Sequence, residues 1–190
     1  MSVRSSSAEV VVDLLTGSYQ LDPVHSRLGF GVRYAVVTKV HGRFDSFDGR
    51  LQLDASDPTR SSVALTIDAA SIRTNNADRD GHLRSGDFFD VERYPTITFD
   101  STAVTVLAED RYRMAGDFTI KGVTRPVELD LAYLGSCVDP YNQLRIGFEG
   151  AGSLKRSDWG LTWNVALEAG GVVLGDRIDL ELDISAIKTD

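Results

Sequence analysis

The feature that most constrains the fold of this chain is an alternation of apolar and polar residues with a period of two. Within residues 178–185, isoleucine and leucine alternate with aspartate, glutamate and serine. Successive side chains of a strand point to opposite faces, so such a run predicts a strand with one apolar and one polar face. Similar runs occur at 27–34, 63–68, 96–100, 111–121, 127–133 and 145–149, with a less regular one around 44–53. We therefore expect about eight strands.

The connections between these runs are short, which favours antiparallel neighbours over parallel βαβ units. Corners are predicted at Asp22-Pro23, Asp48-Gly49, Asp57-Pro58, Lys121-Gly122, Asp139-Pro140 and Gly170-Gly171. Helical patterns are scarce. The only two candidates are short, at 35–40 and 76–84, and neither is long enough to cover a sheet.

A set of two-faced strands without covering helices can form a sandwich or a closed barrel. Closure removes exposed sheet edges, and glycines within strands permit the bending that closure needs. Such glycines are Gly29, Gly31, Gly147, Gly150 and Gly152. We predict an all-β fold, an eight-stranded antiparallel barrel with one or two short helices. A barrel of this size is either filled by its own side chains or hollow enough for one small ligand.

Length, charge and apolar runs limit the domain organisation, the classes of partner and the location that we expect. The 190 residues suit one domain, and we expect a polar N-terminal tail at 1–16 and the barrel domain at 17–190. The net charge of −8 makes nucleic acid a poor partner. Apolar runs of a few residues cannot form a transmembrane helix, and Glu9 and Asp13 interrupt the apolar stretch of a signal peptide. A cytoplasmic location is therefore expected. No motif marks an oligomer interface, although a homodimer is compatible with the sequence.

Three groups of residues have the side chains that metal binding or catalysis uses. The histidines His25, His41 and His82 do not have local ligand spacing, and the single cysteine, Cys137, cannot form a multi-cysteine site. Asp22, His25 and Ser26 have the residue types of a catalytic triad, but they are too close together in a turn. We predict no catalytic residue, no metal and no cofactor.

Two further segments have a functional and a structural interpretation. Asn76-x-Asp78-x-Asp80-Gly81, followed by Asp87, is similar to a calcium loop, but it also suits a helix N-terminus with acids in the first turn. Arg156-Ser157-Asp158-Trp159-Gly160 suits either a head-group site or a structural corner in which Trp159 closes one end of the barrel. The structural interpretation is favoured for both.

Blocks of sequence from about residue 18 to 188 resemble, in order, the YceI-like family. The opening resembles it in Asp22-Pro23-x-His25-Ser26 and Phe30-x-Val32. Further blocks are Val40-x-Gly42-x-Phe44-x-x-Phe47-x-Gly49, Ser71-Ile72-x-Thr74-x-Asn76, Arg79-Asp80-x-His82-Leu83, Asp87-Phe88-Phe89-Asp90, Tyr94-Pro95-x-Ile97-x-Phe99, Thr119-Ile120-Lys121-Gly122-Val123-Thr124 and Arg156-x-Asp158-Trp159-Gly160. The resemblance implies a lipocalin-like barrel that binds polyisoprenoids, such as polyprenyl diphosphates or isoprenoid quinones, without enzymatic activity. Many members of the family carry a secretion signal. This chain is expected to differ from them, because its N-terminal sequence does not resemble such a signal.

The alternation pattern supplies a candidate lining for such a ligand. An isoprenoid chain offers no hydrogen bonds, so binding must come from apolar burial, at about 0.8 kcal/mol for each CH₂ before costs. The predicted lining residues are Phe30, Val32, Leu65, Ile67, Phe99, Met114, Phe118, Leu129, Leu131, Phe148, Leu180 and Leu182. Arg79, His82 and Arg156 are the head-group candidates at the mouth.

The main hypothesis is thus non-enzymatic binding, transport or storage of a long-chain apolar lipid, with two alternatives. The first is an enzyme acting on an apolar substrate, for which the sign would be a buried pair of His82 with Asp80 or Asp87. The second is a stress-response module with a filled core, because inward apolar side chains are also what a solid barrel requires.

Overall fold

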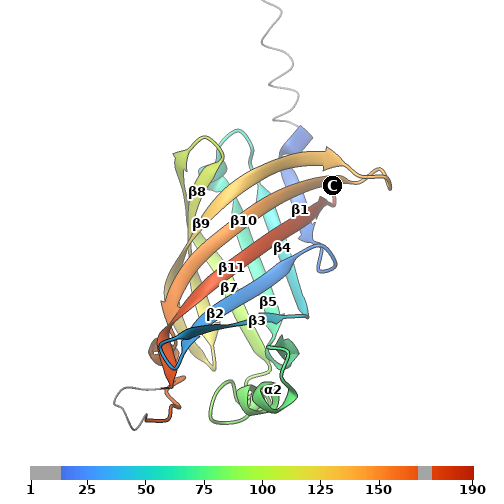
Figure 1. The fold of residues 1–190 in the computed structure, drawn as a ribbon. Coiled ribbons are helices and arrows are strands. Elements are labelled where there is room, and N and C mark those ends of the chain that lie inside the picture. The colour runs from blue at the N-terminus through green and yellow to red at the C-terminus, as the bar shows by residue number, and fades with distance from the viewer. Residues whose placement is uncertain (1–13, 167–172) are drawn as a thin grey trace, which may run out of the picture.

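The described part of the protein is a closed eight-stranded antiparallel β-barrel with a short α-helix at one end (Figure 1). This computed structural model describes residues 14–166 and 173–190, so most of the predicted tail and the Gly170-Gly171 corner lie outside the described residues. The barrel strands are β1 (Gly17–Leu21), β4 (Phe47–Leu53), β5 (Ser62–Asp68), β7 (Thr96–Ala108), β8 (Arg111–Ile120), β9 (Val123–Val138), β10 (Leu144–Lys155) and β11 (Leu174–Lys188). The predicted fold class is confirmed.

The last strand closes the barrel by pairing with two different partners. Its end, at 186–188, pairs with β1, and its beginning, at 174–183, pairs with β2 (Arg27–Tyr34). From β2 the sheet continues through β3 (Thr38–Phe44) to the short β6 (Ile72–Arg73). Residues 22–26 separate β1 from β2, and 45–46 separate β3 from β4, so the N-terminal strands bend where these breaks occur.

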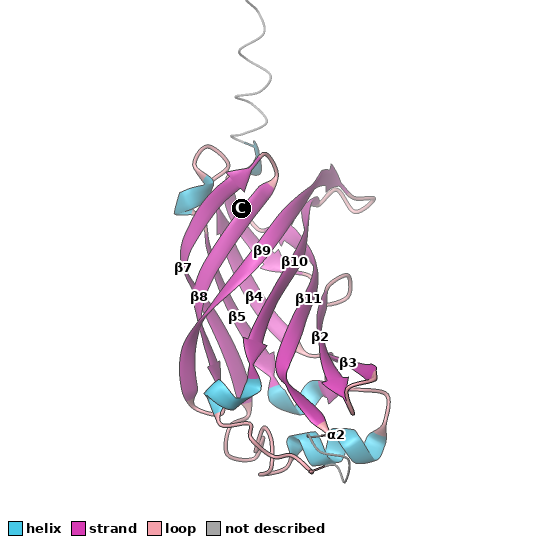
Figure 2. Cartoon of the chain, turned by 60° about the vertical axis from the view of Figure 1, so that its left-hand side comes forward, coloured by secondary structure: helices cyan, strands magenta, loops and turns pink. Residues whose placement is uncertain are grey.

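Helix α2 (Ala77–Arg84) lies across one end of the barrel, opposite the end where the C-terminus lies (Figure 1, Figure 2). Its N-cap is Asn76, whose side chain accepts a hydrogen bond from the Arg79 N–H at 2.9 Å. The residues that the structure describes also form three short 3₁₀ helices: η1 (Pro58–Arg60), η2 (Ala69–Ser71) and η3 (Arg156–Trp159). No helix among the residues that the structure describes is long and apolar enough to cross a bilayer.

Two local predictions are wrong. The helix predicted at 35–40 is a three-residue turn, 35–37, followed by the start of β3. Its apolar residues resembled one helical face, but pairing of β3 with β2 fixes an extended backbone. The corner predicted at Asp48-Gly49 lies within β4, and the chain bends earlier, at Asp45. Gly49 is needed because Leu21 occupies the space of a β-carbon, at 2.8 Å.

Strand glycines have two separate roles in the barrel. Gly147 faces Gly135 across the β9–β10 ladder, where Gly135 has φ +126° and the register shifts, so this pair marks a bulge where the sheet bends. Gly150 instead makes room for leucines of its neighbours, because a β-carbon there would lie 2.8 Å from Leu131 Cδ2. Glycines therefore shape the barrel interior in two ways: some allow the sheet to bend, and others leave space for large side chains of neighbouring strands.

Candidate functional site: an apolar cavity under helix α2

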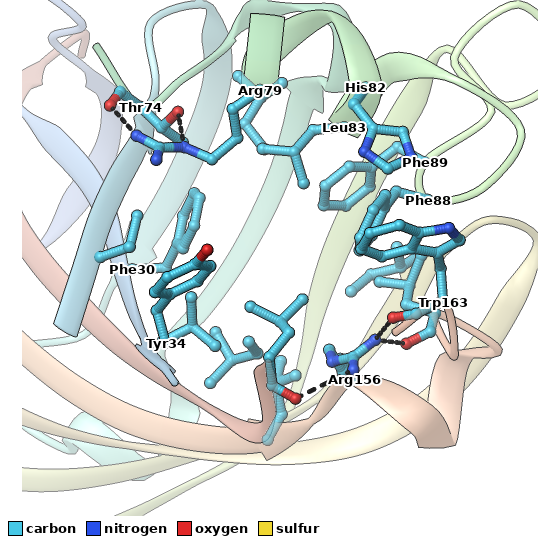
Figure 3. A pocket seen from close by; sticks show the side chains of 18 of the residues that line it. Phe30, Tyr34, Thr74, Arg79, His82, Leu83, Phe88, Phe89, Arg156 and Trp163 are labelled. Atoms are coloured by element: carbon cyan, nitrogen blue, oxygen red, sulfur yellow. Dashed lines mark hydrogen bonds between the residues drawn. The ribbon is translucent and has the colours of Figure 1, made fainter. Parts of the chain in front are cut away.

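A cavity of about 610 Å³ lies inside the α2 end of the barrel (Figure 3). This volume falls within the range of about 300–1,000 Å³ that is typical of small-molecule sites. It is lined by Phe30, Val32, Tyr34, Val40, Phe44, Ile72, Thr74, Asp78, Arg79, His82, Leu83, Phe88, Phe89, Ile97, Phe118, Ile120, Leu154, Arg156, Leu161, Trp163, Val165, Val173, Leu174, Ile178 and Leu180. The barrel is thus hollow at this end, which argues against a filled core.

The wall of the cavity follows directly from strand alternation. Leu180 and Ile178 of β11 are the register partners of Phe30 and Val32 of β2, and all four side chains point inward. The Phe30 ring lies 5.9 Å from that of Phe44, centroid to centroid. Neighbouring strands therefore supply a mainly aromatic and aliphatic surface, to which Tyr34 at the end of β2 adds a hydroxyl.

The cover of the cavity is formed by α2 and the segment that follows it. Leu83, Phe88 and Phe89 point inward from this cover (Figure 3), and Phe89 meets Phe44 edge to face at 5.9 Å. These residues were missed because they lie in a short helix and an irregular segment, where no two-residue alternation marks the inward face. The available signal was the Phe88-Phe89 dipeptide of the family block.

Buried polar contacts attach this cover to the barrel. The Asp80 carboxylate accepts hydrogen bonds from the Thr74 N–H at 2.8 Å and the Thr74 hydroxyl at 2.5 Å, and both residues are buried. Arg84 donates from Nε to the Ala70 carbonyl at 2.7 Å and from Nη2 to the Ile72 carbonyl at 3.1 Å. The position of the cover is therefore fixed by specific hydrogen bonds, which are sensitive to single substitutions.

Two of the three predicted head-group residues lie at the edge of the cavity. Arg79 donates from Nε to the Thr74 hydroxyl and from Nη2 to the Thr74 carbonyl, each at 2.7 Å, which leaves part of its guanidinium available (Figure 3). The His82 ring lies edge-on to Trp163 at 4.5 Å, and its Nε2 lies 2.7 Å from Asp87. Their role toward a head group remains a prediction.

The third head-group candidate, Arg156, is buried and holds the backbone together. Its guanidinium donates to the carbonyls of Leu161, Trp163, Leu174 and Gly175. Burial lowers the pKa of this guanidinium, against the opposing effect of Asp176. With four carbonyl partners, Arg156 has little donor capacity left for a ligand, so its main role is to fix the 161–163 segment beside the start of β11.

Trp159, in the same cluster, has the structural role that its sequence context indicated. Its indole Nε1 donates to the Phe118 carbonyl at 2.9 Å, and its ring is buried against the Phe118 ring. Phe118 lines the cavity, so Trp159 supports the wall from behind.

A second cavity, of about 270 Å³, occupies the other half of the barrel. Four predicted lining residues face the larger cavity: Phe30, Val32, Phe118 and Leu180. Seven face the smaller one: Leu65, Phe99, Met114, Leu129, Leu131, Phe148 and Leu182. Ile67 lines neither and belongs to the buried core. Phe118 of the larger cavity and Phe99 of the smaller one are neighbours, with their ring centroids 6.3 Å apart.

The residues that the sequence offers for catalysis form structural contacts instead. Asp80 bonds to Thr74 rather than to His82, and the His82–Asp87 pair is partly exposed, with 37% and 53% of the two side chains accessible. Ser26 donates its hydroxyl to the Ser185 carbonyl. Within the described ranges, no group of three histidine, cysteine, aspartate or glutamate side chains is arranged to hold a metal ion.

Comparison with known proteins places this architecture in a family. The sequence profile of the YceI-like domain matches residues 19–186. The chain is 36% identical to a UPF0312 protein of Ectopseudomonas mendocina over 184 residues, covering 96% of this chain and 93% of the relative. It is also 36% identical to a UPF0312 protein of Staphylococcus aureus over 165 residues, covering 86% and 94%.

Solved structures have the same fold. The YceI protein of Campylobacter jejuni superimposes with a TM-score of 0.71 at 27% identity, over 83% of this chain and 90% of that one. BcnA of Burkholderia cenocepacia gives 0.75 at 21% identity, over 87% and 98%. A polyisoprenoid binding domain from Saccharophagus degradans gives 0.63 at 18% identity, over 90% and 98%. On the match of its sequence over nearly its whole length, this chain belongs to the YceI-like family.

Proposed function

We propose that this protein binds a long-chain apolar lipid, an isoprenoid, inside its barrel and carries or stores it without transforming it. The observation that carries the proposal is the 610 Å³ cavity with its apolar wall and hydrogen-bonded cover. Burial of apolar surface supplies the affinity, since a five-carbon isoprene unit is worth about 3–4 kcal/mol before the costs of ordering are subtracted. Binding needs no hydrogen bond along the chain of the ligand.

The isoprenoid class is supported by the family and by the barrel's length. The polyisoprenoid binding domain that shares this fold is named for such a ligand. The second cavity lies beyond the first along the same interior, so movement of the Phe99 and Phe118 rings would let one extended chain occupy both. The polar end of such a ligand would face Arg79 and His82. A transport or storage role agrees with the absence of a buried polar pair formed by His82 with Asp80 or Asp87.

The proposal is tested with lipid extraction and lipid uptake. Mass spectrometry of organic extracts from the purified protein should reveal a co-purifying isoprenoid, and delipidated protein should take up added polyprenyl lipid. Leu180→Trp fills the larger cavity and should reduce uptake at least tenfold, whereas Leu182→Trp, two residues further along the same face, projects into the smaller cavity.

The paired variants separate the contributions of the two cavities. A short isoprenoid confined to the larger cavity should be affected by Leu180→Trp alone, and a long one by both variants. Circular dichroism and thermal unfolding check that each variant is folded. Lack of any lipid in extracts, together with no uptake by the delipidated wild type, would contradict the proposal.

A further inference from the structure

An exposed apolar surface surrounds the cavity at the β2–β3 turn. Val36 and Val37 at this turn expose 76% and 78% of their surface. Tyr34, Trp163 and Val165 expose 36–47% and also line the cavity, with Tyr34 and Trp163 on opposite sides of it (Figure 3). These five residues are called the apolar rim. Adjacent large apolar side chains in water are unfavourable, and a patch of them indicates contact with another apolar phase or partner.

The residues of the rim belong to segments that are joined by backbone hydrogen bonds. The Ala35 N–H donates to the Val173 carbonyl at 2.6 Å, and the Val173 N–H donates to the Val165 carbonyl at 2.9 Å. These bonds join the β2–β3 turn to the 161–166 segment. Because Tyr34, Trp163 and Val165 face both the cavity and the outside, apolar surface extends from the interior to the tip of the turn.

The backbone of the turn is not what a solvent-exposed turn favours. Ala35 and Val36 have φ values of +48° and +67°, a left-handed region in which β-branched residues are rare and glycine or asparagine is preferred. Valine here has a conformational cost and places an apolar side chain in water. Strain of this kind is typical of functional surfaces, and it indicates that the apolar character of the tip is itself required.

The segment that carries the turn has a charge opposite in sign to that of the whole chain. Residues 23–44 contain no acidic residue but four lysines and arginines, in a protein of net charge −8. Arg27, Lys39 and Arg43 pair with acidic side chains. Arg33, directly before Tyr34, is exposed and has no ion pair with any residue in the described part of the chain. An exposed cation without an ion pair, next to an apolar tip, is complementary to the phosphates and apolar layer of a bilayer.

We propose that the apolar rim docks on the surface of a lipid bilayer. Val36 and Val37 enter the apolar layer, the rings of Tyr34 and Trp163 lie at the head-group level, as interfacial aromatic residues do, and Arg33 faces lipid phosphates. The docking itself does not require a ligand, but its purpose rests on the proposed function. A water-insoluble lipid could then pass from the bilayer into the cavity without crossing water.

Flotation of the protein with vesicles tests the docking. We use vesicles of phosphatidylcholine, with and without phosphatidylglycerol. The wild type should float with both, more strongly with the anionic lipid. Val36→Asn/Val37→Ser removes two exposed valines and suits a positive φ at 36, so folding is preserved, and its partition coefficient should fall roughly tenfold or more. Arg33→Gln should abolish only the gain from phosphatidylglycerol.

A matched control comes from the opposite end of the molecule. Val138 of β9 is 60% exposed, so Val138→Ser removes an exposed valine away from the rim and should float as the wild type does. Equal flotation of Val36→Asn/Val37→Ser and wild type would overturn the proposal, as would failure of the wild type to float. Analytical ultracentrifugation is run in parallel, and a dimer that the double variant dissociates would identify the rim as an interface between copies instead.

A binding assay without vesicles separates the proposed ligand binding from the proposed docking. It measures uptake of the soluble fluorescent probe N-phenylnaphthylamine. Val36 and Val37 do not line the cavity, so the double variant should bind the probe as the wild type does but acquire polyprenyl lipid from vesicles more slowly. Lack of probe uptake by the wild type would count against the proposed function and leave the flotation result to decide the docking.

Discussion

Arg145 joins two acidic side chains that are far apart in the sequence. Its Nη1 donates to Asp22 at 2.5 Å and its Nε to Asp139 at 2.6 Å, which ties the β1–β2 break to the end of the β9–β10 hairpin. Burial would raise the pKa of Asp22, but the hydrogen bonds from Arg145, His25 and the Val24 N–H outweigh it and lower the pKa to about 2. The Asp22 side chain is 9% exposed, so solvent screens these interactions weakly.

The lowered pKa of Asp22 makes the free energy of unfolding depend on pH. The unfolded carboxyl has a pKa near 3.9, so the stabilisation is complete above about pH 5 and is lost as the pH falls through about 2, amounting to about 2 kcal/mol. Asp22→Asn should lower stability at pH 7 by a similar amount and flatten this acid dependence, as measured by urea unfolding across pH. Asp130→Asn, on the exposed Arg113 pair, should change stability by less than about 1 kcal/mol. An unchanged acid profile in Asp22→Asn would contradict the assignment.

At the scale of elements, helix α2 is a cover held by few contacts. Asp80 is its main attachment, because Thr74 uses both its N–H and its hydroxyl to reach this carboxylate. Asp80→Ala leaves these buried donors without an acceptor and should cost about 2–3 kcal/mol. Hydrogen exchange should then rise in 74–95, and bound lipid should leave faster. Asp78→Ala, an exposed first-turn acid of the same helix, should cost less than about 1 kcal/mol; equal effects of the two would contradict this account.

The elements also show how far sequence reasoning reaches. The β11 strand was predictable because the two-residue period survives in 178–185, and α2 because Asn76 and its acids form an N-terminus. The turn at 35–37 was not predictable, because its apolar residues do not pack in the core and its backbone is determined by the pairing of β2 with β3. The same limit applies to the site. Alternation predicted part of the wall, such as Phe30 and Leu180, whereas the positions of Leu83 and Phe89 depend on how the cover folds back. The carbonyl partners of Arg156 come from segments that only the tertiary fold brings together.

For the whole molecule, a hollow interior means that ligand and stability are linked. A ligand at 100 times its dissociation constant should stabilise the barrel by about 2.7 kcal/mol, which raises Tm by roughly 5–10 °C for a domain of this size. Delipidated protein should therefore melt lower, and added polyprenyl lipid should restore the higher Tm in scanning calorimetry. Restoration by a polyprenyl diphosphate should weaken with salt, and that by a quinone should not. If no apolar lipid changes the Tm, this result would contradict binding of a ligand in the interior.

The double pairing of β11 has a consequence for how the protein is made. The first two strands, β1 and β2, can pair early with β4 and β3, but their shared neighbour lies in residues 174–188. On the ribosome, one edge of each strand therefore waits unpaired until nearly the whole domain has been translated. Closing so distant a contact is slow, and unpaired strand edges invite association meanwhile. Nascent chains of this barrel are therefore expected to depend on chaperones until the last strand emerges, and a shortened chain that ends before residue 174 should be recovered in inclusion bodies.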